Sequence, residues 1–261
     1  MKTTAIILAA GKGSRMHSKI EKQFMELGGY PVIYYALKAF EESPVDSIIL
    51  VTGKNSVEYC RHEIIEKYHF TKVVSVVEGG ENRYDSVYNG LCACPETDYV
   101  MIHDGARPFV TQDMVVRSIQ TLADYKACTV GMPVKDTIKI VNENRIGMAT
   151  PAREYLWQIQ TPQSFDYKCL MKCYQKMMKE RADGAAIAVT DDTMVVEEYG
   201  KIQVKVIEGS YTNIKITTPE DLLFMQPRFL FFHDYLEQLE PVISNDDFVT
   251  VSYTHLRAHE T

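Results

Sequence analysis

The chain has 261 residues, of which 46% are hydrophobic and 24% are charged. This composition is typical of ordinary globular proteins and excludes collagen-like, low-complexity and intrinsically disordered classes, and the length is enough to bury a core without disulfides or metals. Because 28 Lys and Arg stand against 35 Asp and Glu, the net charge is −7, so the chain lacks the overall positive charge that binds nucleic acid. We therefore expect no nucleic-acid partner, and an anionic ligand requires a local basic pocket.

The candidate for an export signal is the apolar run Ala5–Ala10. It is shorter than a signal-peptide core and far shorter than a membrane span. We expect no membrane partner and a cytoplasmic location. In that compartment we expect the six cysteines to be reduced and not to bind metal, because their spacing does not match that of a zinc site.

Short apolar runs alternate with helix-length amphipathic stretches over the first half of the chain. The runs predict buried strands at Ala5–Leu8, Ser47–Val51, Val73–Val77 and Tyr99–Ile102. The stretches predict helices at Pro31–Phe40, Ser56–Tyr68, Asp85–Leu91 and Gln112–Tyr125. This alternation predicts an α/β fold with right-handed crossovers, a Rossmann-like mostly parallel sheet and helices on both of its faces. Ligands of such sheets bind at the carboxyl ends of the strands.

Thr129–Gln163 changes to apolar-polar alternation, as in Thr137–Val141, and predicts an excursion from the core: a protruding β-arm at about 133–160. After it we expect a helix, a strand and a second helix, at Asp166–Glu180, at Gln203–Ile207 and from Pro219 onward. We expect one domain over residues 1–225. Residues 226–261 are a C-terminal extension of unknown role, whose aperiodic end we interpret as artefactual.

The strongest local signal is the loop after the first strand, which reads Ala9-Ala10-Gly11-Lys12-Gly13-Ser14-Arg15 and is followed by Lys22. Glycines at 11 and 13 allow the backbone to approach a phosphate chain, while Arg15 and Lys22 add positive charge. This pattern predicts a triphosphate-binding loop. It lacks the ending of a P-loop and the third small residue of a dinucleotide fingerprint, which disfavours a nicotinamide-dependent dehydrogenase. The alternative interpretation is a glycine turn with a solvated basic face.

Five segments, in order, resemble the 2-C-methyl-D-erythritol 4-phosphate cytidylyltransferases, and the likeness extends from Thr4 to about Leu223. The segments are Leu8–Met16, Glu78–Val87, His103–Pro108, Leu156–Gln163 and Asn213–Asp221. The resemblance implies a nucleotidyltransferase-type fold and a reaction in which CTP and 2-C-methyl-D-erythritol 4-phosphate give a cytidine diphospho product and pyrophosphate, with Mg²⁺. That reaction is a step of non-mevalonate isoprenoid precursor synthesis.

The resemblance also implies roles for individual residues. Arg15 and Lys22 would stabilise the transition state at the CTP α-phosphate, and Arg153 and Lys215 would hold the alditol phosphate as further catalytic residues. Thr137 and Thr161 would bind the same substrate. The positions that would contact CTP are Ala9, Ala10, Gly11, Lys12, Gly13, Gly80, Asp85, Ser86, Asp104, Ala106 and Arg107.

Asp104 ends the fourth predicted strand, where a carboxylate is well placed to hold Mg²⁺ together with substrate phosphates. The alternative is a turn aspartate before Gly105. We interpret the neighbouring His103 as structural.

Two further positions have both a structural and a functional interpretation. For Ser86 the alternative to nucleotide binding is a helix cap. Asp191 and Asp192 precede an apolar run and predict an N-cap and its neighbour, with a supporting role in the site as the alternative.

In the resembling family the arm crosses to the neighbouring subunit of a homodimer, so Thr137 and Arg153 would serve the partner's site. If the segment is instead a simple edge hairpin, Arg153 lies on a solvated face. One departure from the family concerns position 21, where Glu21 stands in place of the usual proline and adds a negative charge beside Lys22.

Two other functions compete with this one. Ribitol 5-phosphate cytidylyltransferase is a sibling with nearly the same CTP loop, but Trp157 and the segment Pro133–Thr137 favour the methylerythritol branch. A non-catalytic nucleotide-binding module is disfavoured because Arg15, Lys22 and Asp104 are all present.

Overall fold

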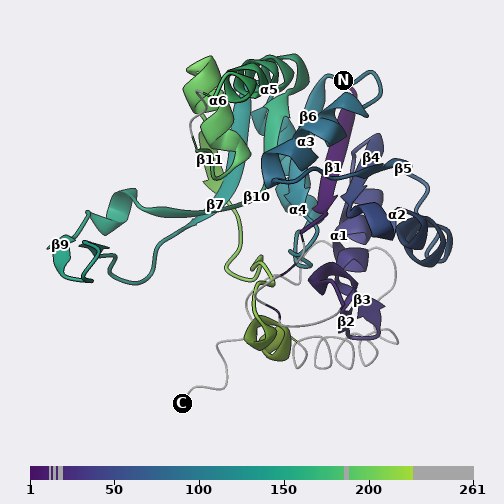
Figure 1. The fold of residues 1–261 in the computed structure, drawn as a ribbon, viewed down its shortest axis with the longest axis horizontal. Helices are drawn as coiled ribbons and strands as arrows, with labels where there is room; N and C mark the ends of the chain where they lie inside the picture. The colour runs from purple at the N-terminus through teal and green to yellow at the C-terminus, as the bar shows by residue number, and fades with distance from the viewer. Residues whose placement is uncertain (12, 14–15, 17–19, 185–187, 226–261) are drawn as a thin grey trace, which may run out of the picture.

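The computed structural model describes residues 1–11, 13, 16, 20–184 and 188–225. Its centre is a seven-stranded sheet with the order β11-β7-β10-β6-β1-β4-β5 (Figure 1). The strands are β1 (Thr3–Ala9), β4 (Ser47–Thr52), β5 (Val73–Glu78), β6 (Tyr99–Asp104), β7 (Ala127–Pro133), β10 (Trp157–Asp166) and β11 (Lys205–Glu208). All neighbouring pairs are parallel except those of β10, which runs antiparallel to both β6 and β7. The predicted mostly parallel sheet is confirmed.

Helices cover the sheet. They are α1 (Val32–Glu41), α2 (Val57–Tyr59), α3 (Arg83–Cys92), α4 (Gln112–Thr121), α5 (Tyr167–Ala182) and α6 (Asp192–Gly200). Residues 219–225 are also helical, as expected. The predicted helix Ser56–Tyr68 is confirmed over most of its length, as α2 followed by a π-helix over Cys60–Glu66. The predicted helix from Gln112 is shorter than expected and ends at Thr121.

The central strands β1, β4 and β6 are buried on both faces, which explains why they are continuous apolar runs. The edge strand β5, predicted to be buried, is only partly so. Successive side chains of a strand point to opposite faces. Ile7 of β1 accordingly packs with Leu37 of α1 on one face, and Ile6 packs with Val87 of α3 and Tyr174 of α5 on the other. The protein thus has two hydrophobic clusters, one on each face of the sheet. In the described part of the chain, no helix combines the length and the hydrophobicity needed to cross a membrane.

The segment Thr129–Gln163, expected as an excursion, begins and ends inside the sheet. β7 and β10 pair from Phe165↔Ala127 to Trp157↔Pro133, so only residues 134–156, hereafter the arm, lie between two core strands. The arm extends away from the body (Figure 1) and carries the short antiparallel strands β8 (Ile140–Val141) and β9 (Gly147–Ala149). Sequence alternation identified the arm but not the two buried strands that hold it, because their pairing partners lie far away in the chain.

The sheet has a topological switch point at β1. The chain continues from β1 to β4 and β5 on one side and then places β6 on the other side. The carboxyl ends of β1 and β6 are therefore adjacent, and the Gly105 N–H donates to the Leu8 carbonyl at 2.8 Å. At such a point two loops diverge and leave room for a ligand.

We predict that Gly90→Ala destabilises the protein although alanine favours helices. A Cβ at Gly90 in α3 would lie 2.7 Å from a methyl group of Ile6 and 3.0 Å from one of Val51. Overpacking costs about 1 to 3 kcal/mol, against about 1 kcal/mol gained from helix propensity. Urea unfolding should show a free energy of unfolding that is lower by up to about 2 kcal/mol, which is the overpacking cost minus the gain in helix propensity.

The control for this variant is Gly147→Ala on the arm, where a Cβ meets nothing within 4 Å. It should change the free energy of unfolding by no more than about 0.5 kcal/mol. A Gly90→Ala protein as stable as this control would contradict the tight packing of α3 on the sheet.

Candidate active site

Asp104, the last residue of β6, is a buried carboxylate with three cationic side chains around it. Its Oδ2 lies 2.9 Å from Lys215 Nζ and 3.5 Å from Arg107 Nε, and its Oδ1 lies 3.7 Å from Arg83 Nε. Burial by itself would raise the pKa of Asp104, but Lys215, Arg83 and Arg107 hold that pKa well below its ordinary value. Asp104 is therefore ionised, and the cations outnumber it.

Arg83 was not among the residues that sequence reasoning selected. Its two terminal nitrogens donate to Asp192 Oδ1 at 2.9 Å and Oδ2 at 2.7 Å, and Asp192 is fully buried. The Tyr174 hydroxyl donates to the same Asp192 at 2.6 Å. Burial works to lower the pKa of Arg83, but the charges of Asp192 and Asp104 raise it overall. Arg83 is thus a permanently charged, rigidly held cation beside Asp104.

The prediction for the two aspartates before α6 is confirmed. Asp191 is the N-cap, and its carboxylate accepts the Met194 N–H at 2.9 Å. Asp192, its neighbour, anchors Arg83 beside Asp104, and a supporting role in the site stays a prediction. The sequence holds no signal for this pairing, since Arg83 and Asp192 are separated by 109 positions.

The segment around Lys215 joins three predicted parts of the site. The Ile216 N–H donates to the Ala106 carbonyl at 2.8 Å, and the Ile216 carbonyl accepts from Lys22 Nζ at 3.0 Å. Lys22, Lys215 and Asp104 therefore lie together although they come from three distant parts of the chain. Figure 1 shows the segment after β11 running down toward the lower end of the body, where β2 (Glu26–Leu27) and β3 (Tyr30–Pro31) lie.

Asn213 holds the segment around Lys215 in place through buried hydrogen bonds. It is fully buried, and its side-chain nitrogen donates to the Thr161 carbonyl at 2.9 Å. Its own carbonyl accepts from the terminal nitrogen of Arg107 at 2.8 Å. Arg107 is held at both ends of its guanidinium, so the cation beside Asp104 has a defined position.

A chain of hydrogen bonds beneath the site defines the protonation state of His103. The Asp104 N–H donates to Thr161 Oγ1 at 3.1 Å, Thr161 Oγ1 lies 2.9 Å from His103 Nδ1, and His103 Nε2 lies 3.2 Å from the Arg107 carbonyl. Because a carbonyl only accepts, Nε2 carries the proton and the Thr161 hydroxyl donates to Nδ1. Burial lowers the pKa of His103 to about 4. The structural role expected for His103 is confirmed, and the hydroxyl proton of Thr161 is committed to it.

The loop between β5 and α3 packs tightly against the first loop. A Cβ on Gly79 would lie 2.4 Å from Ala10 Cβ and 2.8 Å from Ser86 Oγ, so only glycine permits this approach. The Gly80 N–H donates to Ser86 Oγ at 3.0 Å. The predicted CTP-contacting positions Ala10, Gly80 and Ser86 are thereby brought together at the carboxyl edge of the sheet.

The N-cap of helix α3 is Asn82, and Asp85, not Ser86, completes its capping box. Asp85 Oδ2 accepts the Asn82 N–H at 2.9 Å, which is half of a capping box. The Ser86 hydroxyl lies within 3.2 Å of the Asn82 carbonyl, so the interpretation of Ser86 as the cap is wrong.

The loop after β1 is described only in part, and Lys12 and Arg15 lie outside the described residues. Gly13 has a φ of +60° and lies against the side chain of Lys22. The side-chain nitrogen of Gln23 donates to the carbonyls of Ala9 and Gly11. Gln23 is almost fully buried, so it holds the beginning of this loop to the body.

Glu21 turns toward the 3₁₀ turn Lys54–Ser56 that follows β4. Its Oε1 accepts from the Ser56 hydroxyl at 3.1 Å, and its Oε2 accepts from the side-chain nitrogen of Gln23. Both carboxylate oxygens are therefore engaged with neutral donors, whereas Lys22 Nζ bonds to the Ile216 carbonyl.

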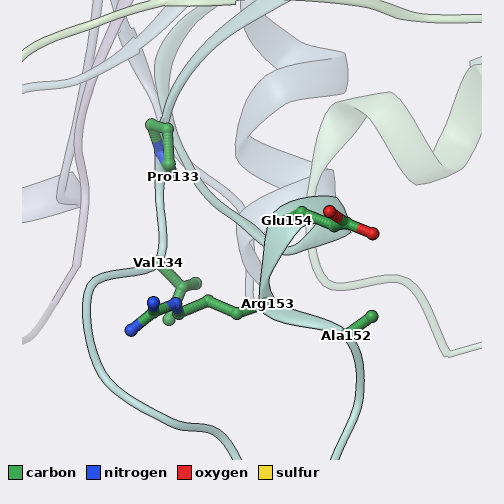
Figure 2. A pocket seen from close by; sticks show the side chains of 5 residues that line it. All are labelled: Pro133, Val134, Ala152, Arg153 and Glu154. Carbon is green, nitrogen blue, oxygen red and sulfur yellow. The ribbon is translucent and has the colours of Figure 1, made fainter.

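The remaining predicted residues, Thr137 and Arg153, belong to the arm. Arg153 begins a 3₁₀ turn (Arg153–Tyr155) and borders a hollow of about 360 Å³ at the base of the arm, whose other walls are Pro133, Val134, Ala152 and Glu154 (Figure 2). Its guanidinium donates to the Lys135 carbonyl at 2.9 Å. Across the described residues, no hydrogen bond or ion pair joins Thr137 or Arg153 to Asp104 of the same chain.

We predict that His103 makes stability depend on pH between about 6.5 and 4. Unfolding restores an ordinary pKa of 6.5 from the folded value of about 4, so in this range the unfolded chain binds a proton that the folded chain does not. Stability contributed by neutral His103 is complete above pH 6.5 and is lost as pH falls, by roughly 3 kcal/mol at pH 4.

The measurement is urea unfolding at several pH values on the wild type and on His103→Asn, whose amide can still accept from Thr161. The variant should show a shallower slope between pH 4 and 6.5. Identical slopes would mean that His103 is not buried as a neutral group.

Comparisons with known proteins agree on one family. The family model for 2-C-methyl-D-erythritol 4-phosphate cytidylyltransferase (IspD) matches residues 3–228. A protein of that name from Lachnospira eligens is 50% identical over 221 residues, which cover 84% of this chain and 95% of the relative.

Solved structures give the same result. The 4-diphosphocytidyl-2C-methyl-D-erythritol synthase from Anaerococcus prevotii has a TM-score of 0.75 and 35% identity, covering 88% of this chain and 98% of the other. For 2-C-methyl-D-erythritol 4-phosphate cytidylyltransferase from Francisella tularensis the TM-score is 0.69 and the identity 31%, over 86% of this chain and 98% of that one. A family model and relatives that match over most of their length show that the chain belongs to the 2-C-methyl-D-erythritol 4-phosphate cytidylyltransferase family.

Proposed function

We propose that the protein transfers CMP from CTP to 2-C-methyl-D-erythritol 4-phosphate and releases pyrophosphate. The observation that carries this proposal is the excess of positive charge around Asp104, where Lys215, Arg83 and Arg107 converge at the switch point of the sheet. Even with Asp192 counted, three cations face two carboxylates, and Lys22 lies next to them. Membership of the family indicates which anions this basic pocket binds.

The reaction requires positioning more than proton transfer. A phosphate monoester has a second pKa near ~6 and is mostly a dianion at neutral pH, so its oxygen needs no general base. That oxygen forms a bond to the α-phosphorus of CTP, the bond from this phosphorus to the oxygen that bridges to the β-phosphate breaks, and pyrophosphate leaves with the electron pair. The protein must hold two polyanions in line and neutralise charge that develops at the α-phosphate.

The residues expected from the sequence would do both. Lys22, with Arg15 from the same loop, would neutralise the α-phosphate, and the backbone of Ala9 to Gly13 would bind the triphosphate. Lys215 would hold the phosphate of the alditol. Its side chain is 37% exposed, so its amine can reach a ligand from its place beside Asp104.

Asp104 would hold Mg²⁺. Among the described residues no three His, Cys, Asp or Glu side chains gather as metal ligands. In nucleotide enzymes, however, Mg²⁺ often takes one or two carboxylates and obtains its other ligands from phosphates and water. An ionised carboxylate at a strand end meets that requirement once a triphosphate is bound. The ion would then offset negative charge on the triphosphate.

A homodimer with exchanged arms completes the proposal. The arm carries exposed apolar side chains far in excess of what a solvated hairpin needs: Ile140, Val141, Ile146, Met148 and Tyr155 are all at least 50% exposed. Exposed apolar groups of this kind mark an interaction surface. Burying them against a second copy would bring Thr137 and Arg153 to the partner's site. The cytoplasmic location expected from the short apolar N-terminal run belongs to the same proposal.

The direct test is a pyrophosphate-release assay with CTP and either alditol phosphate. We expect turnover with 2-C-methyl-D-erythritol 4-phosphate, a much lower kcat/KM with ribitol 5-phosphate, and loss of activity when EDTA removes Mg²⁺. Comparable kcat/KM values for the two alditol phosphates would contradict the substrate assignment, and no release with either would contradict the reaction.

We predict that Lys22→Ala lowers kcat by about 10²-fold, the scale for losing one preorganised contact to the transition state. CTP binding, measured by calorimetry, should weaken much less. The control is Lys201→Ala, which removes a lysine whose side chain is 78% exposed and should leave kcat unchanged. A higher KM at unchanged kcat would show that Lys22 binds ground and transition states equally.

Mixed dimers test whether each site is shared. Lys22→Ala and Arg153→Ala homodimers should both be nearly inactive, since each site lacks one cation. After subunit exchange in an equal mixture, half the dimers are mixed, and one site of each mixed dimer carries neither defect. Activity should then recover to about a quarter of wild type, as two-fold symmetry requires. An inactive mixture, with exchange confirmed by mass spectrometry, would return Arg153 to its own subunit.

A further inference from the structure

Tyr211 connects the segment that carries Lys215 to the base of the arm. Its hydroxyl donates to the Pro133 carbonyl at 2.8 Å, and the Lys135 ammonium lies 3.5 Å from the centre of its ring. These two contacts, which we name the arm latch, are the hydrogen bond and the cation–π interaction that join residues 210–216 to residues 133–156 in the part of the chain that the structure describes.

Tyr211 and Lys135, the two side chains of the arm latch, are each close in the sequence to a residue that the proposed function assigns to the alditol phosphate. Tyr211 precedes Lys215 by four positions, and Lys135 precedes Thr137 by two. On the arm side, the Lys135 carbonyl also accepts from Arg153 at 2.9 Å. The latch therefore lies between one substrate-holding cation, Lys215, and the arm residues that would hold the same substrate in the partner's site.

The segment between Tyr211 and Lys215 is stiff enough to transmit position. Asn213 is fully buried and bonded to the Thr161 carbonyl, and the Ile216 N–H is bonded to Ala106. The base of the arm is less well held. Apart from the latch, its described hydrogen bonds near β7 are those from Val134 N–H to the Leu156 carbonyl, from Leu156 N–H to the Arg153 carbonyl and from Arg153 to the Lys135 carbonyl. The arm therefore takes much of its direction from Tyr211.

We propose that Tyr211 is a positioning residue for the alditol phosphate. It touches no substrate itself. It sets the direction of the arm relative to Lys215. Lys215 would serve the chain's own site, and Thr137 and Arg153 of the arm would serve the partner's site. Tyr211 thereby keeps a defined distance between Lys215 and these two arm residues. This inference rests on the proposed function, and it makes the two sites of a dimer depend on the same tyrosine.

Two variants separate the parts of the latch. Tyr211→Phe loses the bond to Pro133 and keeps the ring beneath Lys135, whereas Tyr211→Leu loses both contacts. We expect the KM for the alditol phosphate to rise about 3-fold in the first and about 10-fold in the second, the sizes expected for one neutral hydrogen bond and for that bond plus an exposed cation–π contact. The KM for CTP should change less than about 2-fold, because no described residue of the nucleotide loops is bonded to the latch.

Tyr125→Leu is the matched control. Tyr125 is also a partly exposed tyrosine with a lysine over its ring, Lys205 at 5.7 Å, but it has no connection to the arm. This variant should leave both KM values unchanged. An equal rise in Tyr125→Leu and Tyr211→Leu would show a general effect of removing a surface ring and would overturn the proposal.

Amide hydrogen exchange tests the mechanical link without any turnover. In Tyr211→Leu, exchange should accelerate in peptides covering 133–141 and 150–156, whereas Tyr125→Leu should match the wild type there. Unchanged exchange in those peptides, or a KM rise for CTP as large as that for the alditol phosphate, would overturn the proposal. If the wild type released no pyrophosphate, the proposed function would fail, and faster arm exchange would still show that Tyr211 sets the arm.

Discussion

The site depends on one interaction, the pairing of the buried Asp104 carboxylate with three cations. A buried charge is costly unless it is paired and hydrogen-bonded, so this carboxylate requires cations from the loops around it. Lys215, Arg83 and Arg107 come from three separate parts of the chain, and each is itself held by the fold. The same requirement that keeps Asp104 charged therefore gathers the cations and fixes where their positive charges lie. Under the proposed function, these charges need no rearrangement before an anionic substrate binds, which is what in-line transfer between two polyanions demands.

The one antiparallel strand explains why the arm emerges at this edge of the sheet. Because β10 runs against β6 and β7, its amino end lies at the carboxyl end of β7. The chain can therefore leave the sheet at Pro133 and return at Trp157 on the side where the site lies. A parallel strand would have needed a crossover to the opposite edge and would have left the arm far from Asp104. The same direction places Thr161 beneath Asp104, where its hydroxyl links the Asp104 backbone to His103.

Much of this architecture was predictable from the sequence, and the exceptions have physical causes. β1, β4 and β6 are buried on both faces and the edge strand β5 is partly buried, so each is a mainly apolar run that can be recognised locally. β10 could not be recognised in this way, because its place between β6 and β7 is decided by partners far along the chain. For the site, glycine spacing and family resemblance selected Lys22, Asp104 and Lys215, which the structure brings together. Arg83 was missed because its importance comes from Asp192, with which no local pattern connects it.

Glu21 shows how a departure from a family pattern can be compatible with the same loop. Its φ of −61° is close to the value that a proline ring imposes, so the backbone conformation is kept without the ring. A proline would hold this backbone by restricting its φ angle. Here hydrogen bonds hold it, since the Glu21 carboxylate accepts from Ser56 and from Gln23. Counting charges along the sequence places this carboxylate beside Lys22 and suggests that it weakens the cation. In the fold the two side chains have different partners, Glu21 in the turn after β4 and Lys22 at the Ile216 carbonyl. The negative charge is therefore used to anchor the end of the loop, and the lysine keeps its place beside Ile216.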